Sequence, residues 1–127
     1  MYVVDVAHTA STLPAAWNSV EVGRVGAVRV KTLRMDGGPL PEEEHAEAEV
    51  LLVLDGRLEL WVDGVEVTVG AGGLFRIPPG TRHAVRPGSR GTLVIVERPE
   101  EADEGAGLDA GLDGGLDGGA GGDVGGA

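Results

Sequence analysis

Short apolar runs separated by turn residues constrain the fold of this chain more than any other feature. Gly, Pro and Asp bound the runs, and no long segment repeats its apolar residues every 3.6 positions. Six runs rich in Val and Leu lie at 25–34, 49–54, 57–62, 65–69, 74–77 and 92–97. Asp55-Gly56 and Asp63-Gly64 each separate two runs and predict hairpin turns, and the second dipeptide better fits a type I′ turn. The pattern predicts an all-β sandwich or barrel, with at most a helical turn at 12–17.

Acidic residues gather at the C-terminal end of the chain. The 127 residues include 21 acidic and 10 basic side chains, which give a formal charge of −11. Residues 100–127 hold eight of the acids, no base and many glycines, so 13 acids and 10 bases (−3) remain for residues 1–99. A glycine-rich segment of one charge sign buries too little apolar surface to offset its ordering entropy. We therefore expect one domain over 1–99 and a disordered tail over 100–127.

Composition also excludes several classes of function. No basic patch is present, as binding to a nucleic-acid backbone would need. The absence of cysteine excludes disulfides and thiolate metal sites. We find no run of about 18 apolar residues and no charged-then-apolar leader. A cytoplasmic location without membrane or nucleic-acid partners is the resulting expectation.

Charged residues precede the apolar run 49–54 at every second position. If 42–49 continued that strand, Glu43, His45, Glu47 and Glu49 would share the face that turns toward the core. Burying unpaired carboxylates on such a face costs several kcal/mol each. A bound cation would offset that cost, and so would a water-filled barrel mouth.

The spacing of these residues resembles the first motif of the cupin superfamily, G-x5-H-x-H-x3,4-E-x6-G. Gly37, Glu43, His45, Glu49 and Gly56 reproduce every interval of this motif over 37–56. The departure is Glu43, which stands where the family has its first histidine.

The second cupin motif, G-x5-P-x-G-x2-H-x3-N, is matched over 72–87. Gly72, Pro78, Gly80 and His83 fall in register, and Pro87 replaces the asparagine. The chain therefore resembles the small single-domain bacterial cupins over roughly residues 20–98. We expect Gly80 to form the tight turn that brings His83 inward.

The resemblance implies a cupin jelly-roll β-barrel that holds one divalent transition-metal ion: Mn, Fe, Ni or Zn. The family's ligand positions correspond to Glu43, His45, Glu49 and His83. Without Glu43, two histidines and one carboxylate remain, a set typical of non-haem iron or manganese sites. A polar pocket without a functional metal is the third reading of the same residues.

Two further roles follow for four charged residues near the expected site. Glu43 or Glu47 could act as a base if it is not a metal ligand. Arg34 and Arg76 lie on runs that could line the barrel, where either could pair with a substrate carboxylate or phosphate. Alternation alone does not decide which face these arginines occupy.

The resemblance implies two classes of function. The first hypothesis is a metal-dependent enzyme, of isomerase, dioxygenase or lyase type, that acts on an oxygenated small molecule. The alternative is a non-catalytic cupin that binds or senses a small molecule. Proteins of this kind are often labelled mannose-6-phosphate-isomerase-like, which describes the barrel and not the reaction. A homodimer is expected from the habit of the family.

Overall fold

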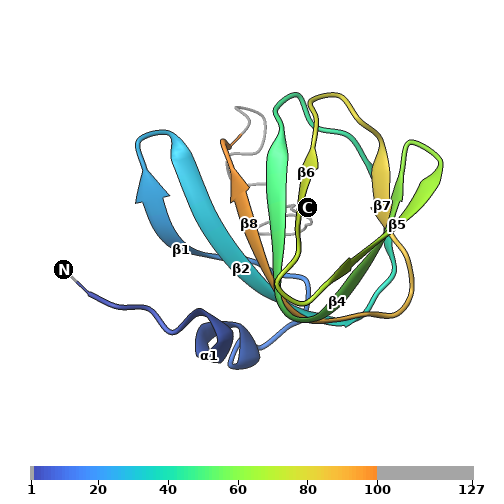
Figure 1. Ribbon diagram of the computed structural model, residues 1–127. Coiled ribbons are helices and arrows are strands. Elements are labelled where there is room, and N and C mark those ends of the chain that lie inside the picture. Colours follow the sequence, from blue (N-terminus) through green and yellow to red (C-terminus); the bar gives the residue numbers. More distant parts are fainter. Residues whose placement is uncertain (1, 100–127) are drawn as a thin grey trace.

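The computed structural model describes residues 2–99, which form a curled antiparallel β-sheet with one short helix (Figure 1). The tail predicted over 100–127 lies outside the described residues. The elements are α1 (Val6–Ser11), β1 (Val20–Val25), β2 (Val28–Gly37), β3 (Leu40–Glu43), β4 (Glu49–Val62), β5 (Val65–Gly70), β6 (Leu74–Ile77), β7 (His83–Val85) and β8 (Ser89–Glu97). The predicted all-β barrel is confirmed.

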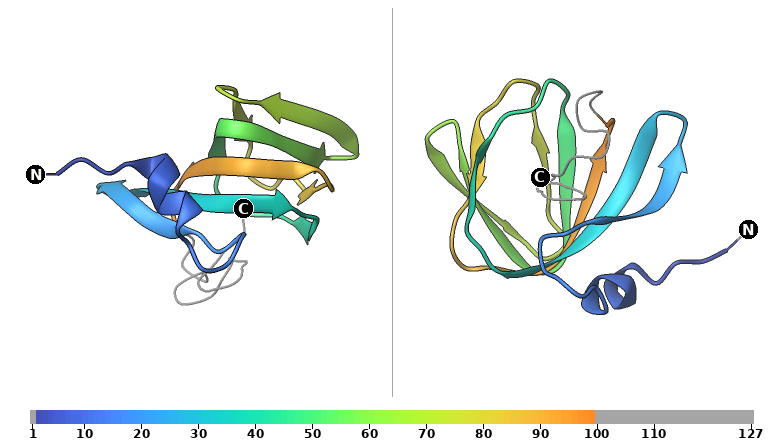
Figure 2. Two further views of the ribbon diagram at one scale, coloured as in Figure 1. Left: turned by 90° about the horizontal axis from the view of Figure 1, so that it is seen from below. Right: turned by 180° about the vertical axis from the view of Figure 1, so that it is seen from behind.

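Strand β4 holds the sheet together because it pairs with four others. The path of the sheet is β1-β2-β8-β4-β7-β3, and β5 and β6 also pair with β4. The first half of β4 lies between β8 and β6, and its second half between β5 and β7. This long strand therefore curls the sheet into the open barrel that Figure 2 shows from two further sides.

The predicted hairpin at Asp55-Gly56 is wrong, because β4 runs through this dipeptide without turning. The pairing of β4 with β8 shifts register between Val53 and Asp55, so the strand bends there. A side chain on Gly56 (φ 77°) would collide with the backbone of β8. The glycine thus permits a close strand crossing. The second predicted turn is confirmed, since Asp63 and Gly64 both have the positive φ of a type I′ turn (52° and 83°).

The helix lies earlier in the chain than the expected turn at 12–17. Asp5 caps α1 by accepting a hydrogen bond from the His8 backbone N–H, and the helix ends at Ser11. Pro14, which follows soon after, cannot continue the backbone ladder. Strands β1, β3 and β7 were not predicted from the sequence; β3 and β7 are too short, at four and three residues, for alternation to be recognised.

The inner face of β2, β8 and β4 forms the core. Leu33, Leu93 and Val53 alternate toward the interior from these three strands and are fully buried. The predicted inward face of the second half of β4 is confirmed, because Leu58 and Leu60 are buried as well. Among residues 2–99, no helix is long and apolar enough to cross a membrane.

Candidate metal centre

The segment 42–49 does not form the single strand that its alternation predicted. Glu43 ends β3, His45 lies in the following loop, and Glu49 begins β4. Glu47 is exposed in that loop. Before this loop, β3 pairs irregularly with β7, with a register shift between Leu40 and Glu43. Three expected ligand residues therefore come from three different local structures.

A tight turn brings His83 to these residues. Gly80 has the left-handed φ of 69° that the sequence prediction required, and its backbone N–H donates to the His45 carbonyl oxygen at 2.7 Å. His83 then starts β7, where it pairs with Glu43 across the ladder to β3. The turn thus fixes the two histidine-bearing segments against each other.

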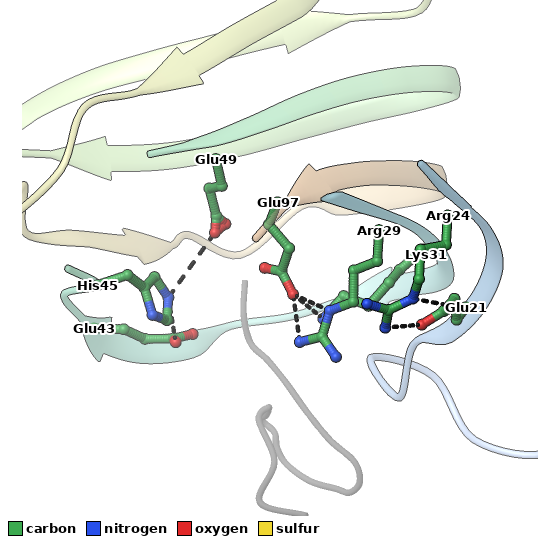
Figure 3. A network of polar contacts seen from close by, with 8 residues as sticks. All are labelled: Glu21, Arg24, Arg29, Lys31, Glu43, His45, Glu49 and Glu97. Carbon is green, nitrogen blue, oxygen red and sulfur yellow. Dashed lines mark hydrogen bonds and ion pairs between the residues drawn. The ribbon is translucent and has the colours of Figure 1, made fainter. Parts of the chain in front are cut away.

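His45, Glu49 and His83 converge at one point inside the barrel. One potential ligand atom from each lies within 4.8 Å of the other two. The Nε2 atom of His45 is 3.9 Å from Glu49 Oε2 and 3.1 Å from Glu43 Oε1 (Figure 3). Nitrogen and oxygen ligands bind divalent ions at about 2.0–2.2 Å, so ligand atoms on opposite sides of one ion are about 4.4 Å apart. The cluster is close to the size that one ion requires.

Glu49 is a buried carboxylate that receives no hydrogen bond from the described part of the chain. It is 3% exposed, and neither of its oxygens has a hydrogen-bond partner within residues 2–99. Burial raises its pKa well above the ordinary value. His45 and Lys31 oppose this rise, whereas Glu97 and Glu43 add to it. A cation held at the same point would reverse this effect and keep the carboxylate ionised.

His83 presents the tautomer that a metal ligand needs. Its Nδ1 atom lies 3.0 Å from the Thr81 carbonyl oxygen, to which it can donate only as Nδ1–H. The Nε2 lone pair then faces the site, and this buried atom has no hydrogen-bond partner among the described residues. Burial lowers the pKa of His83 to about 4, so the ring is neutral at physiological pH. A backbone carbonyl that orients a metal-binding imidazole is a common supporting contact.

The donor set suits a divalent transition ion. Neutral His83, His45 and the buried Glu49 carboxylate supply two nitrogens and an oxygen, the set that suits manganese, non-haem iron or zinc. Glu43, the other predicted ligand, contacts His45 Nε2 at 3.1 Å but is not among the three residues whose ligand atoms converge. The residues present therefore fit the metal implied by the sequence motifs.

The other sequence candidates lie apart from this cluster. Arg34 turns to the outer side of β2 and donates to the Leu13 carbonyl oxygen at 2.9 Å. Arg76 is exposed and pairs with Val50, on the side of the sheet opposite to Glu49. Neither arginine lines the apolar cavity below the cluster. Their role in substrate binding stays a prediction, and so does the role of Glu47 as a base.

A small apolar cavity lies beneath the cluster. Glu43 and His83 border it on one side. Its remaining lining is almost entirely apolar and includes Trp17, Leu33, Leu51, Leu58, Leu60 and Leu93. About 20 Å³ is open to the centres of water-sized molecules, somewhat more than the roughly 10–15 Å³ that one water needs. The barrel floor is thus nearly filled by side chains.

Sequence reasoning missed three charged residues next to the centre: Arg29, Lys31 and Glu97. Glu97 lies directly across the ladder from Glu49, and Figure 3 shows Arg29 and Lys31 on its other side. The signal was present in the chain, because Glu97 continues the alternation of Leu93 and Ile95 on β8. In the same way, Glu49 precedes the alternating buried residues Leu51 and Val53 on β4.

Comparison with known proteins gives one family and several similar structures. The family described as Cupin domain matches residues 32–97. No sequence among the curated proteins matches this chain. A cupin-2 domain protein from Shewanella frigidimarina has 22% identity and a TM-score of 0.70, and the alignment covers 76% of this chain and 95% of that one.

Two further solved structures share the fold. A Rhizobium leguminosarum protein of unknown function has 27% identity and a TM-score of 0.62, with 79% of this chain and 96% of that one covered. The EutQ protein of Clostridium difficile has 18% identity and a TM-score of 0.61, with 79% and 77% covered. These similarities support the fold and do not identify a reaction.

Proposed function

Because this chain belongs to the cupin domain family, we propose that it binds one divalent transition-metal ion and acts on an oxygenated small molecule. His45, Glu49 and His83 would hold the ion, with Glu43 as the fourth ligand or as a base beside it. Manganese, iron, nickel and zinc are the candidate ions. The reaction would be of the isomerase, dioxygenase or lyase type.

One observation carries the proposal: the buried Glu49 carboxylate faces imidazole nitrogens and has no hydrogen-bond partner within residues 2–99. Leaving a buried carboxylate unsatisfied costs about 1–3 kcal/mol or more, because charged groups lose strong hydration. A chain under selection for stability alone would replace it by an apolar residue. A cation that binds Glu49 explains why this residue is acidic.

The protein's own residues would position the ligand and move a proton. A bound ion would supply Lewis-acid polarisation of a carbonyl or hydroxyl oxygen. Glu43 lines the cavity and contacts His45, so it could hold a proton next to a bound ligand. Glu47 is exposed in the loop, which makes it the weaker candidate for this role.

A non-catalytic binding or sensing role is the alternative. This role is favoured if Glu43 is a metal ligand and so cannot act as a base. If Glu43 ligates the ion, the next inward carboxylate is Glu97, which is already held by Lys31 and Arg29. Burial alone would raise the pKa of Glu97, but these two cations lower it on balance, so it is a poor base. The site would then bind a ligand without a proton acceptor.

Metal analysis of protein purified without chelator tests the proposal. We expect close to one equivalent of a single transition ion in the wild type and little in Glu49→Gln. Less than about a tenth of an equivalent, with no rebinding of any of the four ions, would refute it. Among metabolites that shift the melting temperature, consumption identifies an enzyme, whereas stabilisation without consumption identifies a binding protein.

Three further expectations belong to this proposal. A homodimer is supported by the edge strand β1, whose Val25 is 79% exposed, and by the exposed apolar side chains of Tyr2 and Val3. Light scattering on a sizing column would test it. The cytoplasmic location and the division into a domain over 1–99 and a tail over 100–127 stay predictions, which cell fractionation and limited proteolysis would test.

A further inference from the structure

Arg29, Lys31 and Glu97 form an ion cluster beside the candidate metal centre, which we call the mouth cluster. Glu97 Oε2 accepts a hydrogen bond from Arg29 Nη2 at 2.6 Å and lies 2.8 Å from Lys31 Nζ (Figure 3). Two cations therefore share one carboxylate oxygen. Lys31 is only 4% exposed, which is rare for a lysine.

The mouth cluster and the metal centre share one face of the sheet. Arg29 pairs with Glu97 across β2 and β8, and Glu97 pairs with Glu49 across β8 and β4. Residues directly opposite each other in such ladders have Cβ atoms about 4.5–5.5 Å apart. Arg29, Glu97 and Glu49 thus form one row across three strands, with the cations at one end and the centre at the other.

Solvent reaches the centre and the mouth cluster at partly exposed side chains. Leucine side chains nearly fill the barrel floor below the centre. The side chains of Arg29, Glu43 and His45 are 21%, 22% and 20% exposed. Glu97 and Lys31 lie close enough to Glu49 to interact with it electrostatically, so a ligand on the ion lies within the field of the mouth cluster.

With a divalent ion bound, the charged groups of this region would have a net charge of +1. Glu43, Glu49 and Glu97 carry three negative charges, whereas Arg29, Lys31 and a divalent ion carry four positive ones. An uncompensated charge in a poorly hydrated site is costly, and replacing a buried ion cluster by apolar residues is often neutral or stabilising. A ligand with a single negative charge would balance the region.

We propose that the mouth cluster binds the carboxylate of a small monoanionic ligand that also contacts the ion. The inference rests on the metal-binding function proposed above. A guanidinium has five N–H donors and an ammonium three, so Arg29 and Lys31 can hold Glu97 and a ligand oxygen together. A phosphate monoester, with about −1.5 to −2 charges, would exceed the balance. The ligand class is therefore a small carboxylate and not a sugar phosphate.

Calorimetric binding of pyruvate and its neutral amide, pyruvamide, to Mn²⁺-loaded full-length protein tests this assignment. We expect the wild type to bind pyruvate more tightly than both pyruvamide and methyl phosphate. Arg29→Gln should weaken pyruvate binding about tenfold, as expected for a lost hydrogen bond to a charged group, and leave pyruvamide binding unchanged. Lys31→Met, which keeps an apolar stem of similar length, should act in the same direction.

Arg34→Gln is the matched control, because Arg34 lies on the same strand but on its outer face. This variant should keep the wild-type preference for pyruvate. Equal binding of pyruvate and pyruvamide, tighter binding of methyl phosphate, or unchanged pyruvate binding in both mouth-cluster variants would overturn the inference. A Mn²⁺ titration of each variant is done first. Loss of the ion from the wild type overturns the proposed function and this inference together, whereas normal Mn²⁺ binding without pyruvate selectivity overturns this inference alone.

Discussion

Glu49 and Glu59 are buried carboxylates on the same strand, β4, yet their surroundings differ completely. Glu59 Oε1 accepts hydrogen bonds from Arg86 Nη2 at 2.7 Å and Thr68 Oγ1 at 2.6 Å. Arg57 Nε lies 3.1 Å from the second Glu59 oxygen. Neither oxygen of Glu49 has a hydrogen-bond partner among residues 2–99. Burial alone therefore does not identify a functional carboxylate in this barrel.

The difference separates a structural acid from a candidate ligand. Glu59 lies on the outer side of β4, where an arginine from a neighbouring segment neutralises it. Glu49 lies on the inner side, where the imidazoles of His45 and His83 face it. The cations Arg29 and Lys31 are paired with Glu97. The protein supplies the counter-charge in the first case, and a metal ion would supply it in the second.

Exchanging each carboxylate for its amide gives the largest expected contrast. Glu49→Gln should weaken metal binding by about 100-fold or more, since even residues that only support a ligand change metal affinity by about 10–100-fold. Glu59→Gln should leave metal affinity unchanged. Competition with a chromophoric chelator measures both values. Equal losses in the two variants would show that Glu49 acts only through the fold.

When stability is measured without metal, Glu59→Gln should have the larger effect of the two variants. Glu59→Gln should lower the free energy of unfolding by about 2–3 kcal/mol, because Arg86 then keeps a partly buried charge without its partner. Glu49→Gln should be neutral or stabilising, because it removes a buried carboxylate that receives no hydrogen bond from residues 2–99. Urea unfolding in the presence of chelator measures both effects. A destabilised Glu49→Gln protein would contradict the contrast.

A smaller effect is expected from the glutamate that replaces the family's first histidine. Glu43→Gln should weaken metal binding about tenfold if its carboxylate is the fourth ligand, the lower part of the range for groups around a metal. Glu47→Gln is the control, because this residue is exposed in the loop that follows Glu43. Chelator competition on both proteins gives the ratio. Unchanged affinity in Glu43→Gln would favour its role as a base.

The sequence predicted the barrel because the buried strands alternate and Asp63-Gly64 has suitable turn chemistry. It also predicted His45, Glu49 and His83 through the spacing of two motifs. The strand expected over 42–49 was wrong because a long-range hydrogen bond from Gly80 to His45 holds a loop there. Local alternation contains no information about such a contact.

The mouth cluster was missed for a related reason. Apolar side chains occur on both faces of β2, so the sequence could not decide whether Arg29 or Arg34 turns inward. The answer comes from pairing with β8, which places Arg29 opposite Glu97 and leaves Arg34 on the outer face. Face assignment in a strand covered on both sides thus requires its partner strand.

The dependence of stability on pH is the finest test of the contrast. Burial raises the folded-state pKa of Glu49 above the ordinary 4.5, so its contribution to the stability of metal-free protein falls as the pH rises above that value. His83 acts oppositely, because its pKa is lowered from 6.5 to about 4 and its contribution rises across that interval. Above pH 6.5 the Glu49 effect remains without this compensation.

Metal-free wild type should therefore lose about 1 kcal/mol of unfolding free energy per pH unit just above pH 6.5, relative to Glu49→Gln, close to the 1.36 kcal/mol that accompanies one pKa unit. Saturating metal should abolish this slope, because the ion keeps Glu49 ionised throughout the interval. Glu59→Gln should keep the wild-type slope, since the unpartnered carboxylate is still present. Urea unfolding at several pH values measures the three slopes. Identical slopes in wild type and Glu49→Gln would mean that water hydrates Glu49 in solution, and its lack of partners would then no longer distinguish it from Glu59.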